Sequence, residues 1–387
     1  MKASTQTSWR TRQLGDLLKY EQPGRYLVRS TDYSEQGKYP VLTAGKTFVL
    51  GYTNEPNGAY TDHPVIIFDD FTTASKYVDF DFKAKSSAMK MLTARAGAAD
   101  LRFVYERMQL IRYPIFDHKR RWIAEYSKLE IEAPELVEQT AIAEVANDLA
   151  DHIAALERLI AKKQAIKQGM MQQLLTGRTR LPGFTEPWGE QASFEDLCTR
   201  STGFWGASDL SASSPNRVHV ITAGDITPEG HLKGAATRYF SNAQVAKARC
   251  MTDDLVVTSS GNGLGKTAYI DEPGTLAASN FVRILRPRKG VSGSFLAQVM
   301  RTPAARGVLD SNTATSAYPN LLPGFFTERW IPRPPSDEQL AIAGVLQDAD
   351  VEIAALRARV NKARDVKTGM MQQLLSGRAR LQVEAVS

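Results

Sequence analysis

A glycine-rich stretch in the second half of the chain has the spacing closest to a known chemical motif. Residues 259–267 read SSGNGLGKT, which approaches the phosphate-binding loop G-x-x-x-x-G-K-[ST]. The first required glycine is replaced by Ser260, and the residues after Lys266 are typical of a strand. A phosphate-binding loop must instead open a helix, so that its amides and the helix dipole face the phosphate. The stretch predicts an amide-rich turn, suited either to a DNA-backbone contact or to a plain hairpin.

Two acidic pairs are the other candidates for chemistry. Asp69-Asp70 and Asp253-Asp254 adjoin predicted strands, and neither has the spaced lysine and third acid of a metal-dependent nuclease. The five histidines lack zinc-ligand spacing, and Cys198 and Cys250 are too few for a disulfide scaffold. We therefore find no convincing catalytic site. A stand-alone DNA enzyme that uses Lys266 for a nucleotide, or the aspartates for a metal, stays open as an alternative.

Two further segments suit nucleic acid. Residues 113–122, YPIFDHKRRW, mix aromatic and basic side chains that can grip phosphate and stack on bases. Residues 311–322, SNTATSAYPNLL, offer hydroxyls and amides suited to groove edges and phosphate oxygens. The candidate DNA-binding residues are Lys46, Lys76, Lys119, Arg120, Arg121, Ser260, Asn262, Lys266, Thr315, Ser316, Tyr318 and Asn320.

An internal repeat organises the elements that must position these segments. Residues 138–181 and 338–381 are related by a constant offset of 200 residues, and 24 of the 44 positions are identical. Apolar residues recur at alternating spacings of three and four, the heptad seam of a coiled coil. A helix of about 38 residues is roughly 57 Å long and cannot bury its apolar stripe on itself. We expect the two copies to pair antiparallel; the alternative is that each docks alone on its neighbouring lobe.

The ends of these helices carry their own signals. Ser336 and Gln339 predict a capping box at the start of the second copy. Gly177 and Gly377 are each followed by Arg-x-Arg-Leu. They predict C-terminal caps, with the arginines near the negative end of the helix dipole.

Short strand-like segments separated by Gly, Pro and Asn turns make up the rest of the chain. The predicted fold class is α+β, with two mixed α/β lobes separated by two long repeated helices that pair as an antiparallel coiled coil. The expected boundaries are 1–134 and 182–335 for the lobes, and 135–181 and 336–387 for the helical segments. The two lobes share little visible sequence.

The net charge of +6 divides unevenly along the chain. The helical segments are balanced, so the excess of +4 lies in the first lobe and +2 in the second. That distribution suits a polyanion bound by the lobes. We expect basic residues such as Lys83 and Lys90 on a positive face of the first lobe. No apolar run has the length of a signal peptide or a membrane span, so a cytoplasmic protein without a membrane partner is expected.

With these motifs, the chain resembles the specificity subunit of Type I restriction–modification systems. The resemblance covers the whole chain as architecture. At the first junction the sequence departs from the second by having one proline, Pro134, in place of two. The segments that carry the resemblance are PPSDEQLAIA at 334–343, GMMQQLLTGRTRL at 169–181, GMMQQLLSGRARL at 369–381, SSGNGLGK at 259–266, SAYPNL at 316–321, TERWIPRPP at 327–335 and YPVLTAGK at 39–46.

The resemblance implies two target-recognition domains that read a bipartite site in double-stranded DNA. It implies two modification (methyltransferase) subunits and restriction subunits as partners. S-adenosylmethionine, ATP and Mg are expected on those partners, with no cofactor and no catalysis on this chain. The remaining alternative is a coiled-coil adaptor with no role in DNA binding. The expected partner-binding residues are Gln139, Ile142, Met170, Gln339, Ile342 and Met370.

Overall fold

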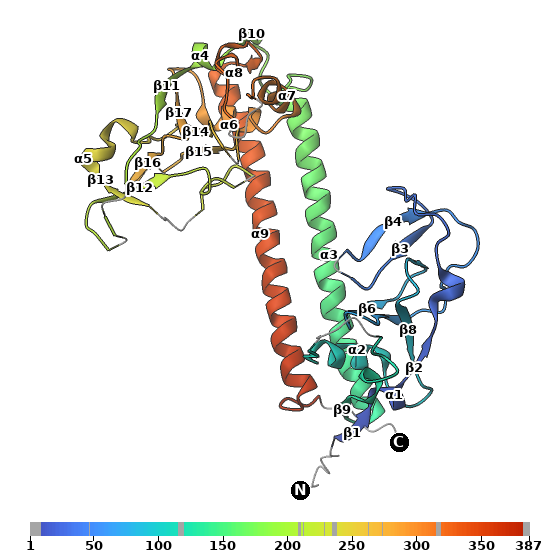
Figure 1. The fold of residues 1–387 in the computed structure, drawn as a ribbon. Coiled ribbons are helices and arrows are strands. Elements are labelled where there is room, and N and C mark those ends of the chain that lie inside the picture. The colour runs from blue at the N-terminus through green and yellow to red at the C-terminus, as the bar shows by residue number, and fades with distance from the viewer. Residues whose placement is uncertain are drawn as a thin grey trace. The chain divides into compact units, whose positions relative to one another are not determined.

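The computed structural model describes residues 9–45, 47–114, 120–207, 210–211, 213–227, 229–233, 238–261, 263–272, 274–314 and 319–381 (Figure 1). The chain divides into two compact units, residues 1–158 with 358–387 (unit 1) and residues 159–357 (unit 2). Each unit contains one lobe, the first half of the long helix that follows this lobe, and the second half of the other long helix.

In unit 1 the lobe is built from small sheets of short strands. A four-stranded antiparallel sheet has the order β2-β8-β5-β6, a three-stranded sheet the order β4-β3-β7, and β1 pairs with β9. The elements are β1 (Arg10–Gln13), α1 (Leu14–Leu17), β2 (Leu18–Glu21), η1 (Pro23–Tyr26), β3 (Tyr39–Leu42), β4 (Val49–Thr53), β5 (Val65–Asp69), β6 (Ser75–Val78), β7 (Lys83–Ala84), β8 (Met89–Ala94), α2 (Leu101–Gln109), η2 (Tyr126–Lys128) and β9 (Glu130–Ala133).

In unit 2 the lobe has sheets of the order β11-β17-β14-β15, β13-β12-β16 and β10-β18. Residues 293–311 form two helices, because Pro303 begins a second helix that Thr302 caps. The elements are β10 (Gly189–Ala192), α4 (Phe194–Leu197), β11 (Cys198–Thr202), β12 (Arg217–Ile221), β13 (Tyr239–Ser241), α5 (Asn242–Val245), η3 (Ala246–Ala248), β14 (Leu255–Thr258), β15 (Thr267–Tyr269), β16 (Leu276–Ala278), β17 (Val282–Pro287), α6 (Gly293–Val299), α7 (Pro303–Ser311), α8 (Gly324–Thr327) and β18 (Ile331–Arg333).

The two lobes share one topology, although their sequences have diverged. The sheet β2-β8-β5-β6 corresponds strand by strand to β11-β17-β14-β15, and β4-β3-β7 corresponds to β13-β12-β16. In both three-stranded sheets one neighbour of the middle strand is antiparallel and the other is parallel. The repeat therefore includes the lobes as well as the helices.

The long helices α3 (Leu136–Leu174) and α9 (Ser336–Leu375) pair antiparallel, as the sequence predicted (Figure 1). In unit 2, Lys163 pairs with Glu352 at 2.7 Å and Lys167 with Asp350 at 2.5 Å. In unit 1, Arg364 Nη2 lies 2.6 Å from Glu157 Oε1. The fold-class prediction is confirmed. Within the described residues, no helix is long and apolar enough to cross a membrane.

Part of the predicted seam belongs to the lobes instead. Ile142 and Ala146 are buried in the core of unit 1, and Ile342 and Leu346 in the core of unit 2. At these ends each helix packs on its own lobe and against the end of the other long helix. Leu356, in contrast, is a buried residue of the α9 stripe outside both lobe cores. The helices therefore pair and also pack on the lobes, so the alternative in which each docks alone is wrong.

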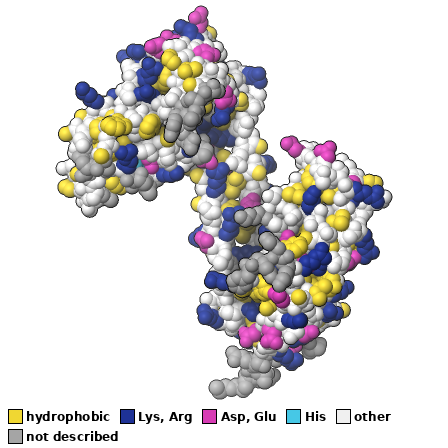
Figure 2. Space-filling view, viewed as in Figure 1, with side chains coloured by type: hydrophobic (Ala, Val, Ile, Leu, Met, Phe, Trp, Pro, Cys, Tyr) yellow, Lys and Arg dark blue, Asp and Glu magenta, His cyan; other side chains and the backbone are white. Residues whose placement is uncertain are grey.

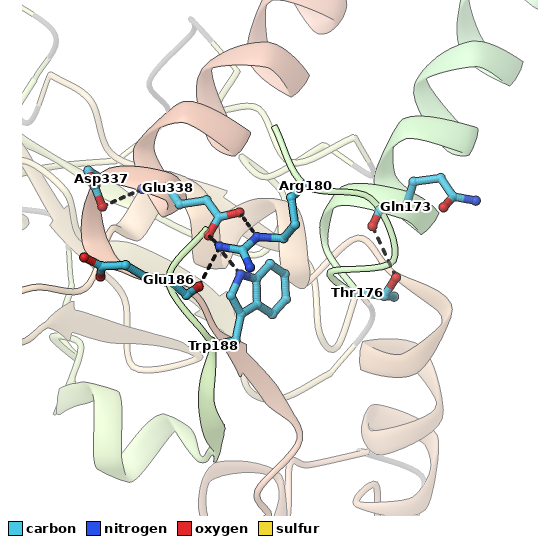
Figure 3. A network of polar contacts seen from close by, with 7 residues as sticks. All are labelled: Gln173, Thr176, Arg180, Glu186, Trp188, Asp337 and Glu338. Atoms are coloured by element: carbon cyan, nitrogen blue, oxygen red, sulfur yellow. Dashed lines mark hydrogen bonds and ion pairs between the residues drawn. The ribbon is translucent and has the colours of Figure 1, made fainter. Parts of the chain in front are cut away.

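A buried carboxylate joins the end of α3 to the start of α9 in unit 2 (Figure 3). Glu338, whose side chain is 0% exposed, pairs through both oxygens with Arg180, with Nη2 at 2.6 Å from Oε2. Trp188 Nε1 donates to the same oxygen at 2.9 Å. Gly177 has the positive φ expected of a C-terminal cap. Arg180, three residues after Gly177, pairs with Glu338 on the other helix, a partner that the sequence did not predict.

Unit 1 has the corresponding ion pair between the start of α3 and the segment after α9. Arg380 pairs with both oxygens of Glu138, and its guanidinium lies 6.0 Å from the centre of the Trp9 ring. Gly377 has a φ of 69° and packs against Trp9. Each unit therefore holds the start of one repeat and the end of the other with one ion pair.

The predicted capping box at Ser336 is not formed. Gln339 donates from Nε2 to Pro334 O at 2.9 Å and accepts at Oε1 from Ser292 N at 2.9 Å. Gln139 makes the corresponding bonds in unit 1, to Pro134 O at 2.8 Å and from Asp100 N at 3.1 Å. These amides satisfy buried main-chain groups that water does not reach. They fasten each lobe to the start of its helix.

We expect Asp350→Asn to weaken helix pairing in unit 2. Asp350 lies 2.5 Å from Lys167 and 2.8 Å from Arg301, and all three side chains are at most 21% exposed. Removing the one carboxylate leaves two partly buried cations without a counter-charge, at a cost of about 2 kcal/mol. Hydrogen exchange in α9 at increasing urea concentration measures this loss. Glu352→Gln is the matched control, because its pair with Lys163 is more exposed and should contribute less than about 1 kcal/mol.

The same pairing predicts a loss of stability in acid. Burial alone would raise the pKa of Asp350, but the hydrogen bond from Lys167 and the charges of Lys167 and Arg301 outweigh burial and lower this pKa. A carboxyl whose folded-state pKa is lowered stabilises the fold above its unfolded pKa of about 3.9, and the contribution is lost as the pH falls through the folded value. From about pH 5 to 7 the pH lies above the unfolded-state pKa, so the stability difference between wild type and Asp350→Asn should be constant there. In more acidic buffer this difference should shrink. A difference that stays constant in acid would contradict this role.

Candidate nucleic-acid interface

The glycine-rich stretch is the connection of a β-hairpin in unit 2. Strands β14 and β15 pair antiparallel, with Val257 opposite Thr267. Thr258 N donates to Lys266 O, and Gly265 N donates to Thr258 O, both at 2.8 Å. Because a strand follows Lys266, the loop has no helix N-terminus to offer a phosphate. The geometry therefore does not fit the nucleotide-binding alternative.

The segment 311–322 lies against this hairpin. Gly261 N donates to Pro319 O at 2.9 Å, and Leu321 N donates to Ser259 O at 3.0 Å. Ser260 and Asn320 form an isolated antiparallel bridge between the two segments. The structure thus brings together two segments that the sequence assigned to DNA separately.

A cavity of about 460 Å³ opens beside this junction. Its wall includes Ser260 and Asn320 from the two loops. Arg200 comes from β11, Asn280 from the turn before β17, and Arg283 from β17. Among the described residues its lining contains two guanidinium groups and no carboxylate. Neither arginine was among the predicted DNA-binding residues, because nothing in the sequence distinguishes them from other strand arginines.

Unit 1 has a corresponding junction. Arg121 N donates to Asp70 O at 3.0 Å, as Leu321 N does to Ser259 O in unit 2. Asp70 directly follows β5, as Ser259 directly follows β14, the corresponding strand. Residues 120–122 and residues 320–322 therefore occupy the same place in the two lobes.

The side chains at the unit 1 junction differ in exposure. Arg120 is exposed, whereas Arg121 is 3% exposed and donates to Phe71 O at 3.0 Å. Lys76 lies on β6 with its Nζ 6.0 Å from the centre of the Phe48 ring. Arg120 is thus available to a ligand, and Arg121 is occupied within the lobe.

Two lysines expected on a positive face of the first lobe are buried, so that expectation was wrong. Lys83 is 1% exposed and pairs with Glu55. Lys90 is 1% exposed and lies 3.0 Å from Asp70. On the face shown in Figure 2, the Lys and Arg side chains of both lobes are interspersed with acidic and apolar ones.

The acidic pairs have structural roles. Asp70 accepts from Trp122 N at 2.9 Å besides pairing with Lys90. Asp254, with 0% exposure, receives two bonds of 2.8 Å from Arg286. Among the described residues, no group of three His, Cys, Asp or Glu side chains could hold a metal ion.

The two cysteines are free and buried. Burial raises the pKa of Cys198 and of Cys250 to about 12. Both thiols are therefore protonated at neutral pH. They suit packing in the core of unit 2 and not nucleophilic chemistry.

The residues predicted to bind partner subunits fall into two groups. Gln139, Ile142, Gln339 and Ile342 are at most 4% exposed; the two glutamines bond to their own lobes, and the two isoleucines lie in the cores of the units. Met170 is partly buried, and Met370 is 39% exposed. The predicted DNA-binding residues that lie outside the described part of the chain are Lys46, Lys119, Asn262, Thr315, Ser316 and Tyr318.

Solved structures with the same fold come from one kind of assembly. The S subunit of a Type-I restriction-modification system from M. genitalium matches with a TM-score of 0.64 and 14% identity, over 99% of this chain and 99% of that chain. A second match is a chain from a structural study of complex assembly and conformational transition of the type I R-M system. It has a TM-score of 0.51 and 15% identity, over 95% of this chain and 97% of that chain. At such identities these structures show the fold alone. No protein-family model matches the chain.

Two curated relatives match part of the sequence. The EcoR124I/EcoR124II specificity subunit of a Type I restriction enzyme from Escherichia coli is 55% identical over 126 residues, which is 31% of each chain. This part of the chain is therefore similar to the specificity subunit of a Type I restriction enzyme. The EcoKI specificity subunit of Escherichia coli strain K12 is 28% identical over 127 residues, 32% of this chain and 27% of that relative. The matches thus span less than a third of the length of either specificity subunit.

We expect Gly265→Ala to disturb the hairpin of unit 2 more than Gly261→Ala. Both glycines have a φ near +78° (77° and 78°), so alanine adds strain of about 1 kcal/mol at either position. Only at Gly265 would the new Cβ collide with a neighbour, Leu309 Cδ2, at 2.3 Å. Displacing this core side chain should cost a further 1–3 kcal/mol, about the penalty of overpacking.

Thermal unfolding and hydrogen exchange of residues 258–267 measure both variants. Gly261 is the matched control, because an added Cβ there meets nothing within 4 Å. Equal destabilisation by the two alanines would show that the contact with Leu309 does not hold the hairpin in place.

Proposed function

We propose that the chain is the DNA-recognition subunit of a Type I restriction–modification complex and binds an asymmetric bipartite site in double-stranded DNA. The repeated lobe carries the proposal: both lobes have one strand order and hydrogen-bond a corresponding loop to the residue after β5 or β14. The exposed residue of this loop is Arg120 in unit 1 and Asn320 in unit 2. Lobes with one scaffold and different loop residues suit one half-site each.

Affinity and sequence preference then come from different side chains. Lys and Arg of the lobes neutralise phosphates, which makes affinity fall steeply with salt. Polar loop residues read base edges in the grooves. In unit 2 these are Ser260 and Asn320, together with the predicted Asn262, Thr315 and Ser316.

The paired helices connect the recognition lobes and set the spacing between the half-sites. Two modification subunits and the restriction subunits bind the same chain, with Met170 and Met370 among the contacts. Adenine methylation and cleavage, with S-adenosylmethionine, ATP and Mg, belong to those subunits, and this chain does no chemistry. Like the DNA it binds, the complex is cytoplasmic.

Sequencing the methylome of a host that carries this chain with its cognate modification subunit tests the proposal. A bipartite methylated motif with a non-specific spacer is expected. ATP hydrolysis or DNA cleavage by the isolated chain would favour a stand-alone enzyme instead. The absence of sequence-specific DNA binding in the presence of the methyltransferase partner would favour an adaptor.

We expect Asn320→Ala and Arg120→Gln to weaken binding in different ways. Loss of an amide that reads a base should relax preference at one half-site by about 1–3 kcal/mol. Loss of a phosphate contact at Arg120 should weaken binding nearly uniformly and reduce the slope of log affinity against log salt by about 1.

Affinities of the assembled complex for duplexes altered in one half-site at a time distinguish these effects. Each variant is also the control for the other, since the two residues occupy corresponding positions of different lobes. Equal losses on every duplex for both variants would contradict the division between base reading and phosphate binding.

A further inference from the structure

Two arginines share one wall of the unit 2 cavity. Arg283 on β17 is opposite Thr202 of β11, and Arg200 lies two residues before Thr202 on the same face. Burial, and then the charge of Arg200, lowers the pKa of Arg283. The two guanidinium groups are therefore close enough to repel each other.

Neither arginine is neutralised within the described chain. Arg200 lies over the Phe326 ring, with Cζ 4.5 Å from the ring centre, a contact that leaves its charge unbalanced. Arg283 has no ion pair or side-chain hydrogen bond to a described residue. A partly buried cation beside another cation is costly, because little water replaces the missing counter-charge.

In unit 1 the residue that corresponds to Arg283 is Lys90, and its charge is neutralised by a carboxylate of the same lobe. Lys90 lies two residues before Leu92, which is opposite Tyr20. Arg283 likewise lies two residues before Leu285, which is opposite Arg200. Arg283 thus corresponds to Lys90, and Arg200 to Tyr20.

The counter-charge of Lys90 is Asp70, at 3.0 Å. Asp70 N donates to Ala88 O, and Ser259 N donates to Phe281 O, in the corresponding place of unit 2. Ser259 therefore stands where unit 1 has the carboxylate. Unit 2 has lost the internal anion and gained a second cation, Arg200.

An anion from outside the chain would supply the missing counter-charge for the partly buried Arg283 and the exposed Arg200. A neutral base would leave both positive charges uncompensated, whereas a phosphodiester supplies a negative charge and the oxygens that guanidinium groups bind in pairs. Thr202, Ser260 and Asn280 in the cavity wall offer further donors. The cavity is also beside Asn320, so a phosphate bound here would bring the adjoining nucleotide to the loop that reads bases.

We propose that Arg200 and Arg283 form a seat for one phosphate of the DNA backbone in the second lobe, a seat that the first lobe lacks because Asp70 already neutralises Lys90. The inference rests on the proposed function and names the group that this part of the interface binds.

The test measures DNA affinity against salt for the full chain in its restriction–modification complex, with duplexes that contain or lack the methylated motif. Arg283→Gln and Arg200→Gln should each lower affinity about tenfold on both duplexes and reduce the salt slope by about 1, with the ratio between duplexes unchanged. Arg306→Gln is the matched control, because it removes the same charge from an exposed residue of unit 2 that pairs with Asp310. It should retain both affinity and slope.

A second variant keeps the proposal testable if removal of an arginine impairs folding. Ser259→Asp places the carboxylate of unit 1 in unit 2, where it should pair with Arg283 and exclude phosphate. We expect unchanged or higher thermal stability with the same loss of DNA affinity and salt slope. Unchanged affinity in this variant and in Arg283→Gln would overturn the proposal.

Other outcomes have distinct meanings. A change in base preference at one half-site, with the salt slope unchanged, would show that the arginines read a base and would overturn the phosphate seat. Stabilisation by inorganic phosphate that Arg283→Gln abolishes, with DNA affinity unchanged, would assign the seat to a free anion and also overturn it. If the wild-type complex does not distinguish the two duplexes, the proposed function itself fails.

Discussion

The buried carboxylate at the start of each long helix is the constraint on which the rest of the structure depends. Glu338 has no exposed surface, and a carboxylate in that position is stable only with a cation beside it. The cation is Arg180, from the end of the other helix, and Glu138 has Arg380 in the same way. The start of each repeat therefore requires the end of the other, which fixes the antiparallel direction of the pair.

This pairing also builds the cores of the lobes. In unit 2, Leu174 and Leu175 from the end of α3 share a core with Ile342 from the start of α9 and Phe325 from the lobe. Unit 1 has the corresponding arrangement, with Leu374 packed in the core that holds Ile142. A lobe without both helices would expose part of its core. Folding of each lobe and pairing of the helices are therefore one process.

Side-chain patterns predicted the helices well, because a long repeat with heptad spacing of apolar residues is compatible with few structures other than paired helices. They did not predict the partner of Arg180, since Glu338 is 158 residues away and a terminal arginine also fits the helix dipole. Lys83 and Lys90 were misplaced because residue type alone does not reveal a buried carboxylate nearby. The common topology of the lobes was invisible because main-chain hydrogen bonds between short strands preserve it while the side chains change.

The contrast between Asp70 and Ser259 shows how one scaffold can present two chemistries. The main chain at both positions makes the same bonds, with Asp70 N donating to Ala88 O at 3.0 Å and Ser259 N to Phe281 O at 2.8 Å. The main-chain conformation at this position therefore accommodates either an aspartate or a serine. A carboxylate here balances the strand cation from within, and a hydroxyl leaves that charge for a ligand. Because the fold does not depend on the choice, a single position can decide whether the lobe needs an external anion.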